Sequence, residues 1–311
     1  MGSKVVALKA SAAQLASTGH TEEAHRIPLR HRRTKFDFSA VPAYWLGGDA
    51  FLTRFIDAMS INFPDGERFF MDSVRNYASQ VTDPQLSEDI KLFIRQEAQH
   101  GHIHDLYNEM IAAQGINVEG VIKQIKTELA LAQKYLPKKV LLAMTAAAEH
   151  LTATLGEGLL ELSPEILGSA HPQMRALYAW HAAEEVEHKA VAFDVYQKTA
   201  DGDYATRALA LVAITLLVHL KVAMIMNHMF KVDGITGKPL VVARGIWKMY
   251  GPNGIFTKLA PRFFAWFKPG FHPWDTALPP VAATWIAEYE KHQDPKLAAD
   301  VAFAKHAAAA A

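Results

Sequence analysis

Two short stretches with the same internal spacing decide the fold expected for this chain. They are RQEAQHGHIH at residues 95–104 and WHAAEEVEH at residues 180–188. Each contains a Glu-x-x-His motif, formed by Glu97 with His100 and by Glu185 with His188. Side chains three positions apart lie on one face of a helix, so that a carboxylate and an imidazole can reach the same metal ion. A single motif is common by chance, whereas two in one chain indicate a shared metal site.

A lone glutamate on a preceding predicted helix accompanies each motif. Glu67 stands thirty residues before Glu97, and Glu149 stands thirty-six residues before Glu185. This order of ligands is the one that a four-helix bundle with two metal ions requires. Glu149 lies in the apolar run LLAMTAAAEHLTATL, where an unpaired buried charge would be very costly. The predicted metal ligands are Glu67, Glu97, His100, Glu149, Glu185 and His188.

The ligand set predicts which metals the site prefers. Four carboxylates neutralise the charges of two divalent ions, and each ion gains one histidine. The chain has no cysteine, which excludes iron–sulfur clusters, thiolate zinc sites and disulfides. Oxygen and nitrogen ligands without sulfur favour two iron ions, with manganese or zinc as alternatives.

Three further residues share the helix faces that carry the motifs. His104 lies seven residues after Glu97, which places it about 20° away around the helix at ~100° per residue. His181 and Tyr178 precede Glu185 by four and seven residues, on the same face. They are candidate catalytic residues, as further ligands, as groups that hydrogen-bond to the ligands, or as proton donors. The alternative is that they are buried, hydrogen-bonded residues of the core.

Three other polar neighbours are excluded by their position on the helix. His150 and Glu187 point about 100° or more away from the adjacent ligands. Glu184 adjoins Glu185, but the spacing to His188 selects Glu185 as the ligand.

Helical periodicity dominates the chain and alternating strand patterns are scarce, so the predicted fold class is all-α. Pro64 and Pro84 are expected in first turns of helices. Helices are predicted near residues 51–60, 65–80, 84–114, 119–132, 137–162, 172–199, 203–230 and 279–291. The predicted organisation is a flexible N-terminal tail at 1–35, a metal-binding helical bundle at 36–200, and a hydrophobic helix with an aromatic-rich extension at 201–311 that packs on the bundle.

Two segments of the C-terminal region raise the question of a membrane. Residues 207–230 are apolar around the whole helix, but His219 and Lys221 interrupt the run. This favours a helix buried in the protein or in a homodimer interface over one embedded in a bilayer. Residues 255–274 combine aromatic and basic residues, which suits a membrane interface or a substrate entrance, with packing on the bundle as the alternative.

The charge balance and the N-terminus bear on partners and location. Basic and acidic residues number 32 each, which argues against a nucleic-acid partner. The basic stretch HRIPLRHRRTK near the N-terminus is not followed by an apolar signal segment. The expected location is the cytoplasm, with the inner face of the membrane as a further site.

The motif-bearing segments resemble those of a bacterial family labelled predicted metal-dependent hydrolases, whose sequence pattern is that of the ferritin-like superfamily. The segments are FPDGERFF (63–70), RQEAQHGHIH (95–104), AAAEHLTA (146–153), WHAAEEVEHKAVAFDVY (180–196) and FHPWD (271–275). The resemblance covers roughly residues 30–290. It implies a ferritin-like helical bundle with a dimetal carboxylate core and additional C-terminal helices. It also carries the six predicted ligands over to the positions given above.

Three functions fit these observations. The first is a non-haem diiron oxidoreductase that activates dioxygen on a small apolar substrate, such as an acyl chain, with an unknown electron donor. The alternative is a metal-dependent hydrolase in which a metal-bridging hydroxide is the nucleophile. The third is a metal-binding protein without turnover, against which the long C-terminal region argues. Dioxygen chemistry predicts an elongated apolar pocket that reaches the metals and opens toward residues 207–274. Hydrolysis predicts a polar cleft that water can enter.

Overall fold

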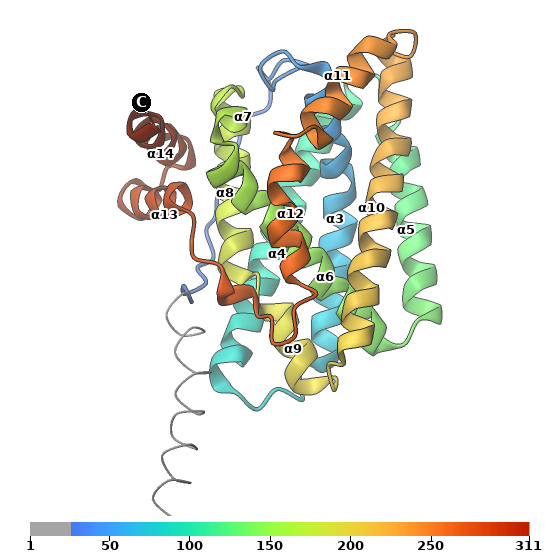
Figure 1. Cartoon of the computed structure of the whole chain (residues 1–311), viewed down its shortest axis with the longest axis vertical. Helices are drawn as coiled ribbons and strands as arrows, with labels where there is room; N and C mark the ends of the chain where they lie inside the picture. The colour runs from blue at the N-terminus through green and yellow to red at the C-terminus, as the bar shows by residue number, and fades with distance from the viewer. Residues whose placement is uncertain (1–25, 311) are drawn as a thin grey trace, which may run out of the picture.

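A computed structural model describes residues 26–310, which form helices and connecting loops without a β-strand (Figure 1). The predicted all-α class is therefore confirmed. The helices are α3 (Ala50–Ala78), α4 (Pro84–Ala112), α5 (Val118–Tyr135), α6 (Lys138–Glu157), the π-helical turn η1 (Gly158–Leu162), α7 (Pro164–Gly168), α8 (Pro172–His188), α9 (Val191–Thr199), α10 (Tyr204–Val232), α11 (Pro239–Tyr250), α12 (Ile255–Ala265), the 3-10 turn η2 (Pro273–Asp275), α13 (Pro280–His292) and α14 (Pro295–Ala310).

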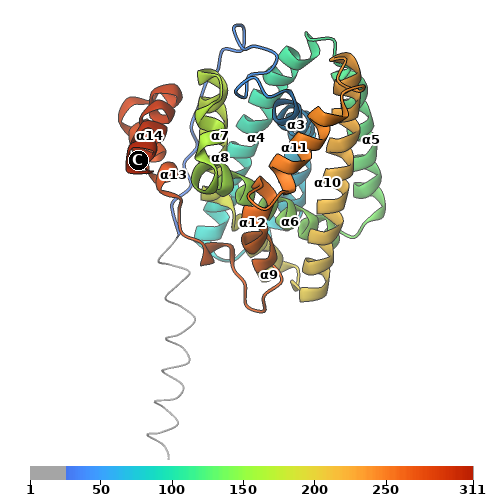
Figure 2. The same ribbon diagram turned by 45° about the horizontal axis from the view of Figure 1, so that its top comes forward.

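Four helices, α3, α4, α6 and α8, form the part of the molecule that carries the predicted ligands. Helix α3 packs against α4, α6 packs against α8, and the two pairs contact each other through α3 with α6 and α4 with α8. Helices α5 and α10 lie side by side at one flank of this bundle, and α13 and α14 lie at the opposite flank beside α8 (Figures 1 and 2). The bundle therefore has its ligand-bearing faces turned inward and other helices outside.

Residues 51–60 and 65–80 were predicted as separate helices with Pro64 in a first turn. They belong to one helix, α3. Pro64 lies inside one continuous helix of 29 residues. Because proline has no N–H, it leaves the carbonyl of Ser60 without its helical partner. The Nδ2 of Asn108 on α4 donates to this carbonyl at 3.2 Å. The helix continues because a neighbouring side chain satisfies the group that proline leaves free.

Helix α4 agrees with the prediction at both ends within two residues. Asp83 caps its start, since the Oδ1 atom accepts hydrogen bonds from the N–H groups of Gln85 and Leu86. Pro84 occupies the first turn as predicted.

The predicted helix at 172–199 is interrupted. Helix α8 ends at His188, and a turn at Lys189 and Ala190 separates it from α9. The turn buries Lys189, whose Nζ donates to the Oε1 of Glu157 at 2.8 Å and to the carbonyl of Thr276 at 3.0 Å. A buried ammonium is tolerated here because it has both a counter-charge and a carbonyl partner.

The C-terminal region is more helical than predicted. The expected helix at 279–291 corresponds to α13, but α11, α12 and α14 were not predicted. Helices α11 and α14 start at prolines 239 and 295, a placement that the sequence analysis did not use. Helix α14 continues through residues 305–310 to the end of the described chain.

The N-terminal segment is bound to the bundle over its described part. Most of the predicted tail, residues 1–25, lies outside the described residues. Residues 26–38, here called the N-terminal strap, run without regular secondary structure and bury Leu29, Arg32 and Phe38. Arg26 forms an ion pair with Asp89 on α4. The expectation of a flexible tail is therefore wrong for residues 26–35, because their side chains have partners in the bundle.

Helix α10 is not buried within the chain, although burial there was one of the two expectations for residues 207–230. Its burial in a homodimer interface stays a prediction. By length and composition it is the one helix among residues 26–310 that could cross a membrane, yet only 28% of its most apolar stretch is buried. One side packs against α6 and α3, and the other side is exposed.

Candidate metal centre

The six predicted ligands meet inside the four-helix bundle. Helix α3 contributes one of them, α4 two, α6 one and α8 two, and none is more than 5% exposed. Their ligand atoms form groups that lie within 4.8 Å of one another. These groups are Glu67 with Glu97 and His100, Glu97 with Glu149 and His188, His100 with Glu185 and His181, and Glu67 with His104 and His181. Between them, the last two groups include His104 and His181, which are not among the six predicted ligands. We call Glu67, Glu97, His100, Glu149, Glu185 and His188 the metal cluster.

The atoms that face one another in the metal cluster fit a cation. The Nε2 of His188 lies 3.1 Å from Glu97 Oε1, 3.2 Å from Glu149 Oε2 and 3.6 Å from Glu185 Oε2. The Nδ1 of His100 lies 3.6 Å from Glu185 Oε1. Within residues 26–310, none of these atoms except Glu185 Oε1 has a hydrogen-bond partner. Buried carboxylate oxygens and ring nitrogens without partners are costly unless a metal ion binds them.

The pKa values of residues in the metal cluster also indicate a cation site. Burial raises the pKa of Glu67 and Glu97 well above the usual range, and neighbouring carboxylates raise it further. Burial also raises the pKa of Glu149 to about 7. Although burial opposes it, the charges of Glu185 and Glu149 raise the pKa of His188 well above its usual value. Without metal, the cluster therefore retains protons that metal ions would displace.

We expect metal binding to release protons and to become tighter as the pH rises toward about 7. The raised pKa of Glu149, about 7, means that its carboxyl is protonated below this pH and must lose a proton to bind an ion. Titration calorimetry in buffers of different protonation enthalpy measures the number of protons released per ion. Binding that releases no proton at a pH near 6 would show that these carboxylates are not the ligands.

A hydrogen-bond partner outside the metal cluster orients His100. The Nε2 of His100 lies 3.0 Å from the Oε2 of Glu184, so that an N–H at this position donates to the carboxylate. The lone pair of Nδ1 then faces the cluster. The second oxygen of Glu184 accepts from Nη1 of Arg32 at 3.1 Å.

A parallel chain of contacts orients His188. Its Nδ1 lies 3.1 Å from the Oε1 of Gln96, which leaves Nε2 facing the cluster. The Nε2 of Gln96 donates to Glu187 Oε2 at 2.9 Å, and Arg32 donates to both oxygens of Glu187 at 2.5 and 2.9 Å. A single guanidinium thus connects to both histidines of the metal cluster, through Glu184 on one branch and Glu187 on the other.

Arg32 is enclosed where the N-terminal strap meets α13. Its guanidinium carbon lies 5.6 Å from the ring centre of Trp285 and 5.8 Å from that of Tyr289. Only 4% of the residue is exposed. A buried guanidinium between two carboxylates and two aromatic faces has fixed geometry.

These outer residues were not identified from the sequence. Glu187 does point away from the metal cluster as predicted, but toward Arg32, and Glu184 is a partner of His100. The sequence does contain a clue to Arg32, since Glu184 and Glu187 need a cation nearby when they are buried. The basic stretch near the N-terminus supplies that cation, Arg32.

The candidate catalytic residues His104 and His181 lie beside the metal cluster in a hydrogen-bonded row. The Oγ of Ser60 lies 2.9 Å from His104 Nδ1, His104 Nε2 lies 2.8 Å from His181 Nδ1, and His181 Nε2 lies 3.0 Å from Glu185 Oε1. Hydrogen bonds use all four ring nitrogens, which suits partners of the ligands. Both histidines also form a possible metal-binding group with Glu67, so their role stays a prediction.

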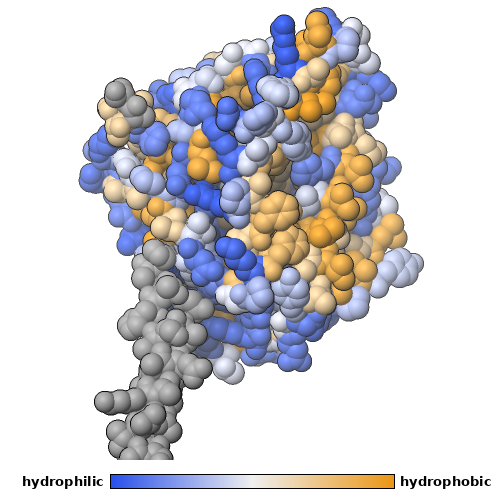
Figure 3. Space-filling view, in the orientation of Figure 1, coloured by the Kyte–Doolittle hydropathy of each residue, from blue (hydrophilic) through white to orange (hydrophobic). Residues whose placement is uncertain are grey.

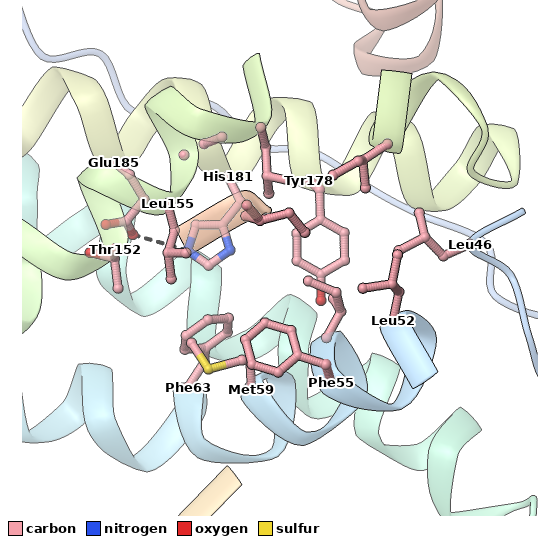
Figure 4. A pocket seen from close by; sticks show the side chains of 16 residues that line it. Leu46, Leu52, Phe55, Met59, Phe63, Thr152, Leu155, Tyr178, His181 and Glu185 are labelled. Carbon is pink, nitrogen blue, oxygen red and sulfur yellow. Dashed lines mark hydrogen bonds and ion pairs between the residues drawn. The ribbon is translucent and has the colours of Figure 1, made fainter. Parts of the chain in front are cut away.

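An apolar pocket borders the metal cluster, and Glu185, His181 and Tyr178 form part of its wall (Figure 4). The remaining wall is almost entirely aliphatic and aromatic, with Phe55 and Phe63 of α3 among its members (Figure 4). The hydroxyl of Tyr178 is buried and makes no hydrogen bond. An apolar pocket of about 70 Å³ thus borders the metal cluster, and Ile255, from the predicted region 207–274, lines it. Its predicted elongated shape and its opening toward that region stay predictions.

The comparisons with known proteins define the class of this chain. A family described as predicted metal-dependent hydrolase matches residues 30–277, so the chain belongs to that family, as the motifs indicated. No curated protein and no solved structure matches the chain. The likeness to ferritin-like bundles therefore stays a prediction. The description of the family agrees with the hydrolase alternative better than with dioxygen activation.

Proposed function

We propose that this metal-dependent enzyme holds two metal ions in the metal cluster and acts on an apolar molecule that enters the adjacent pocket. The observation that carries the proposal is a shared wall, because Glu185 belongs both to the metal cluster and to the lining of the pocket. A substrate in the pocket would therefore lie next to the ions.

The distances suggest how the two ions are divided among the ligands. Glu149 and His188 would hold one ion, and Glu67 and His100 would hold the other. Glu97 belongs to both groups, and the two oxygens of Glu185 each lie 3.6 Å from a ring nitrogen, one of His188 and one of His100. Glu97 and Glu185 would thus be available as ligands to either ion. Carboxylate-rich ligation favours iron, with manganese or zinc as alternatives.

The apolar wall of the pocket favours oxidation of an apolar substrate with dioxygen, whereas the family description favours hydrolysis. Two iron ions in this place would supply the electrons that dioxygen chemistry needs, replenished by an external donor. Phe55, Phe63 and the other apolar side chains of the pocket wall would exclude water from the reaction. The row from Ser60 through His104 and His181 can move a proton to or from Glu185.

Hydrolysis is the second candidate, because the description of the family names it. It requires water and the polar group of the scissile bond to enter the same pocket. The side chains of Thr152 and Tyr178 are the polar groups in the pocket wall apart from His181 and Glu185. They could bind one carbonyl oxygen of an ester with a long apolar chain.

Oxygen consumption after loading with ferrous iron separates the two reactions. The metal-free protein is loaded with Fe²⁺ without oxygen and then mixed with oxygenated buffer, with and without a long-chain fatty acid. We expect uptake that the fatty acid stimulates. A Leu155→Trp variant should remove the stimulation, because Leu155 lines the pocket and the larger side chain narrows it. Leu151→Trp is the matched control, one turn earlier on α6 and not part of the pocket lining.

The hydrolase alternative is tested with the same preparation. Protein loaded with Zn²⁺ or Mn²⁺ is incubated without oxygen with an aryl ester of a long-chain acid. Turnover of this ester, together with no oxygen uptake by the iron form, would overturn the dioxygen proposal and establish hydrolysis.

A further inference from the structure

Exposed apolar side chains gather on α10, α11 and α12, on the face seen in Figure 3. The most exposed of them each expose 59–70% of their surface. They are Leu209, Leu216 and Leu220 on α10, Leu240 and Trp247 on α11, and Phe264 on α12. We call this surface the apolar face. An exposed apolar area formed by three helices is larger than the scattered apolar residues of an ordinary protein surface and indicates an interaction site.

The apolar face follows from the spacing of residues on α10. Leu209, Leu216 and Leu220 recur at seven and four positions, which keeps them on one side of the helix. The opposite side is buried, as Leu211 and Ile225 show. The helix is therefore apolar on both sides, and the bundle covers only one of them.

The charges around the apolar face are strongly unbalanced. Residues 204–274 contain nine basic residues and a single acidic one, Asp233, although the whole chain has 32 of each. Four of these basic residues are exposed and have no carboxylate partner within the described part of the chain. They are Lys231, Lys238, Arg244 and Lys268. The segment that carries the apolar face thus presents four basic side chains without a carboxylate partner among the described residues, which is complementary to a negatively charged surface.

We propose that the apolar face binds the surface of an anionic lipid bilayer, with α10, α11 and α12 lying in the interface. Exposed apolar side chains with basic residues around them are the composition of helices that bind in this way. Trp247 and Tyr250 on α11 add the amphipathic aromatic rings that prefer the level of the lipid headgroups.

Neither a membrane-spanning helix nor a second copy of the chain fits as well. Helix α10 packs along α6 and α3, and Lys221 at its middle forms an ion pair with Glu128 of α5 at 2.7 Å. These contacts keep one side of α10 on the protein. Two copies that met through the apolar face would bring two groups of basic residues together, and their repulsion disfavours a dimer.

The bilayer surface would lie next to the entrance region of the pocket. Ile255 begins α12 and lines the pocket, and Phe256 contacts Phe55 of the pocket wall with ring centres 5.9 Å apart. An apolar substrate could thus pass from the lipid to the metal cluster. This passage of substrate from the lipid rests on the proposed function, whereas the binding of the apolar face to lipid does not.

Vesicle flotation of the full chain tests the proposal. We expect the protein to float with vesicles made of equal parts phosphatidylcholine and phosphatidylglycerol, and much less with phosphatidylcholine alone. The double variant Leu240→Glu/Trp247→Glu should lose the binding. Since one basic residue near an anionic surface contributes about fivefold to partitioning, Lys238→Glu/Arg244→Glu should lower it more than tenfold. Leu297→Glu on α14, at the opposite flank, is the matched control and should bind normally.

Three results would overturn the proposal. The first is no flotation of the original chain, and the second is flotation that the Leu240→Glu/Trp247→Glu variant leaves unchanged. The third is a dimer, measured by light scattering, that this variant separates, which would assign the apolar face to a second copy. Flotation is measured with metal-free and with metal-loaded protein. A failure of metal loading would contradict the proposed function and leave the lipid result intact.

Discussion

Replacing Glu149 with glutamine should lower the metal content from two ions to one or fewer per chain and abolish turnover. The substitution keeps the shape of the side chain but removes a charge from the group formed with Glu97 and His188. The ion in that group would lose a ligand and part of its neutralisation. We expect the affinity for metal to fall by more than ~100-fold, because the loss of a ligand should cost more than the loss of a residue that only hydrogen-bonds to a ligand. Elemental analysis after dialysis against a weak chelator measures the content.

A second buried glutamate on the same helix provides the control. Glu157 is as buried as Glu149, but its Oε1 accepts from Lys189 at 2.8 Å and it belongs to no metal-binding group. Glu157→Gln should therefore lower thermal stability and keep both ions. If Glu149→Gln kept its full metal load and its turnover, Glu149 would not be a ligand.

Replacing Arg32 with methionine should have the second large effect, although Arg32 touches no predicted ligand. The variant leaves Glu184 and Glu187 buried without their counter-charge, which costs about 3–5 kcal/mol of folding stability. The carboxyls would take up protons or rotate away, so that His100 and His188 lose their orientation. Metal affinity should fall about 10- to 100-fold, as measured by competition with a chelator.

A spectroscopic measurement separates this positioning role from a purely structural one. The absorption spectrum of the Co²⁺-substituted protein reports the geometry around the ions, and it should change in Arg32→Met. Arg32→Lys should restore it only in part, because an ammonium cannot donate to both carboxylates in the fixed geometry of a guanidinium. Arg30→Met is the control, since that side chain is exposed and pairs only with Glu290 of α13. An unchanged cobalt spectrum in Arg32→Met would show that Arg32 acts on stability alone.

The bundle and the convergence of its ligands could be predicted because both depend on local spacing. An i, i+3 pair fixes a helix face, and an apolar context around Glu149 predicts that the face is buried. The structure brings the six residues together, while their role as ligands remains a prediction that the variants above test.

The features that were not predicted depend on contacts between distant parts of the chain. Pro64 was placed at a helix start because the donor that replaces its missing N–H, Asn108, lies on another helix. Arg32 was placed in a flexible tail because its partners lie about 150 residues further along the chain. Helices α11 and α12 were not predicted, and residues 255–274 were interpreted only through their aromatic and basic composition.

The contact of Arg32 with Trp285 and Tyr289 of α13 has a consequence for the order in which the chain folds. Arg32 and Trp285 are separated by 253 positions, and Trp285 is near the end of the described chain. Contacts across such long loops form late in folding, because closing the loop costs entropy that only the finished bundle can offset. During synthesis, all four ligand-bearing helices are complete before α13 exists. Metal ions could therefore reach the glutamates from the side of α8 while it is still uncovered, and the arrival of α13 would close that route.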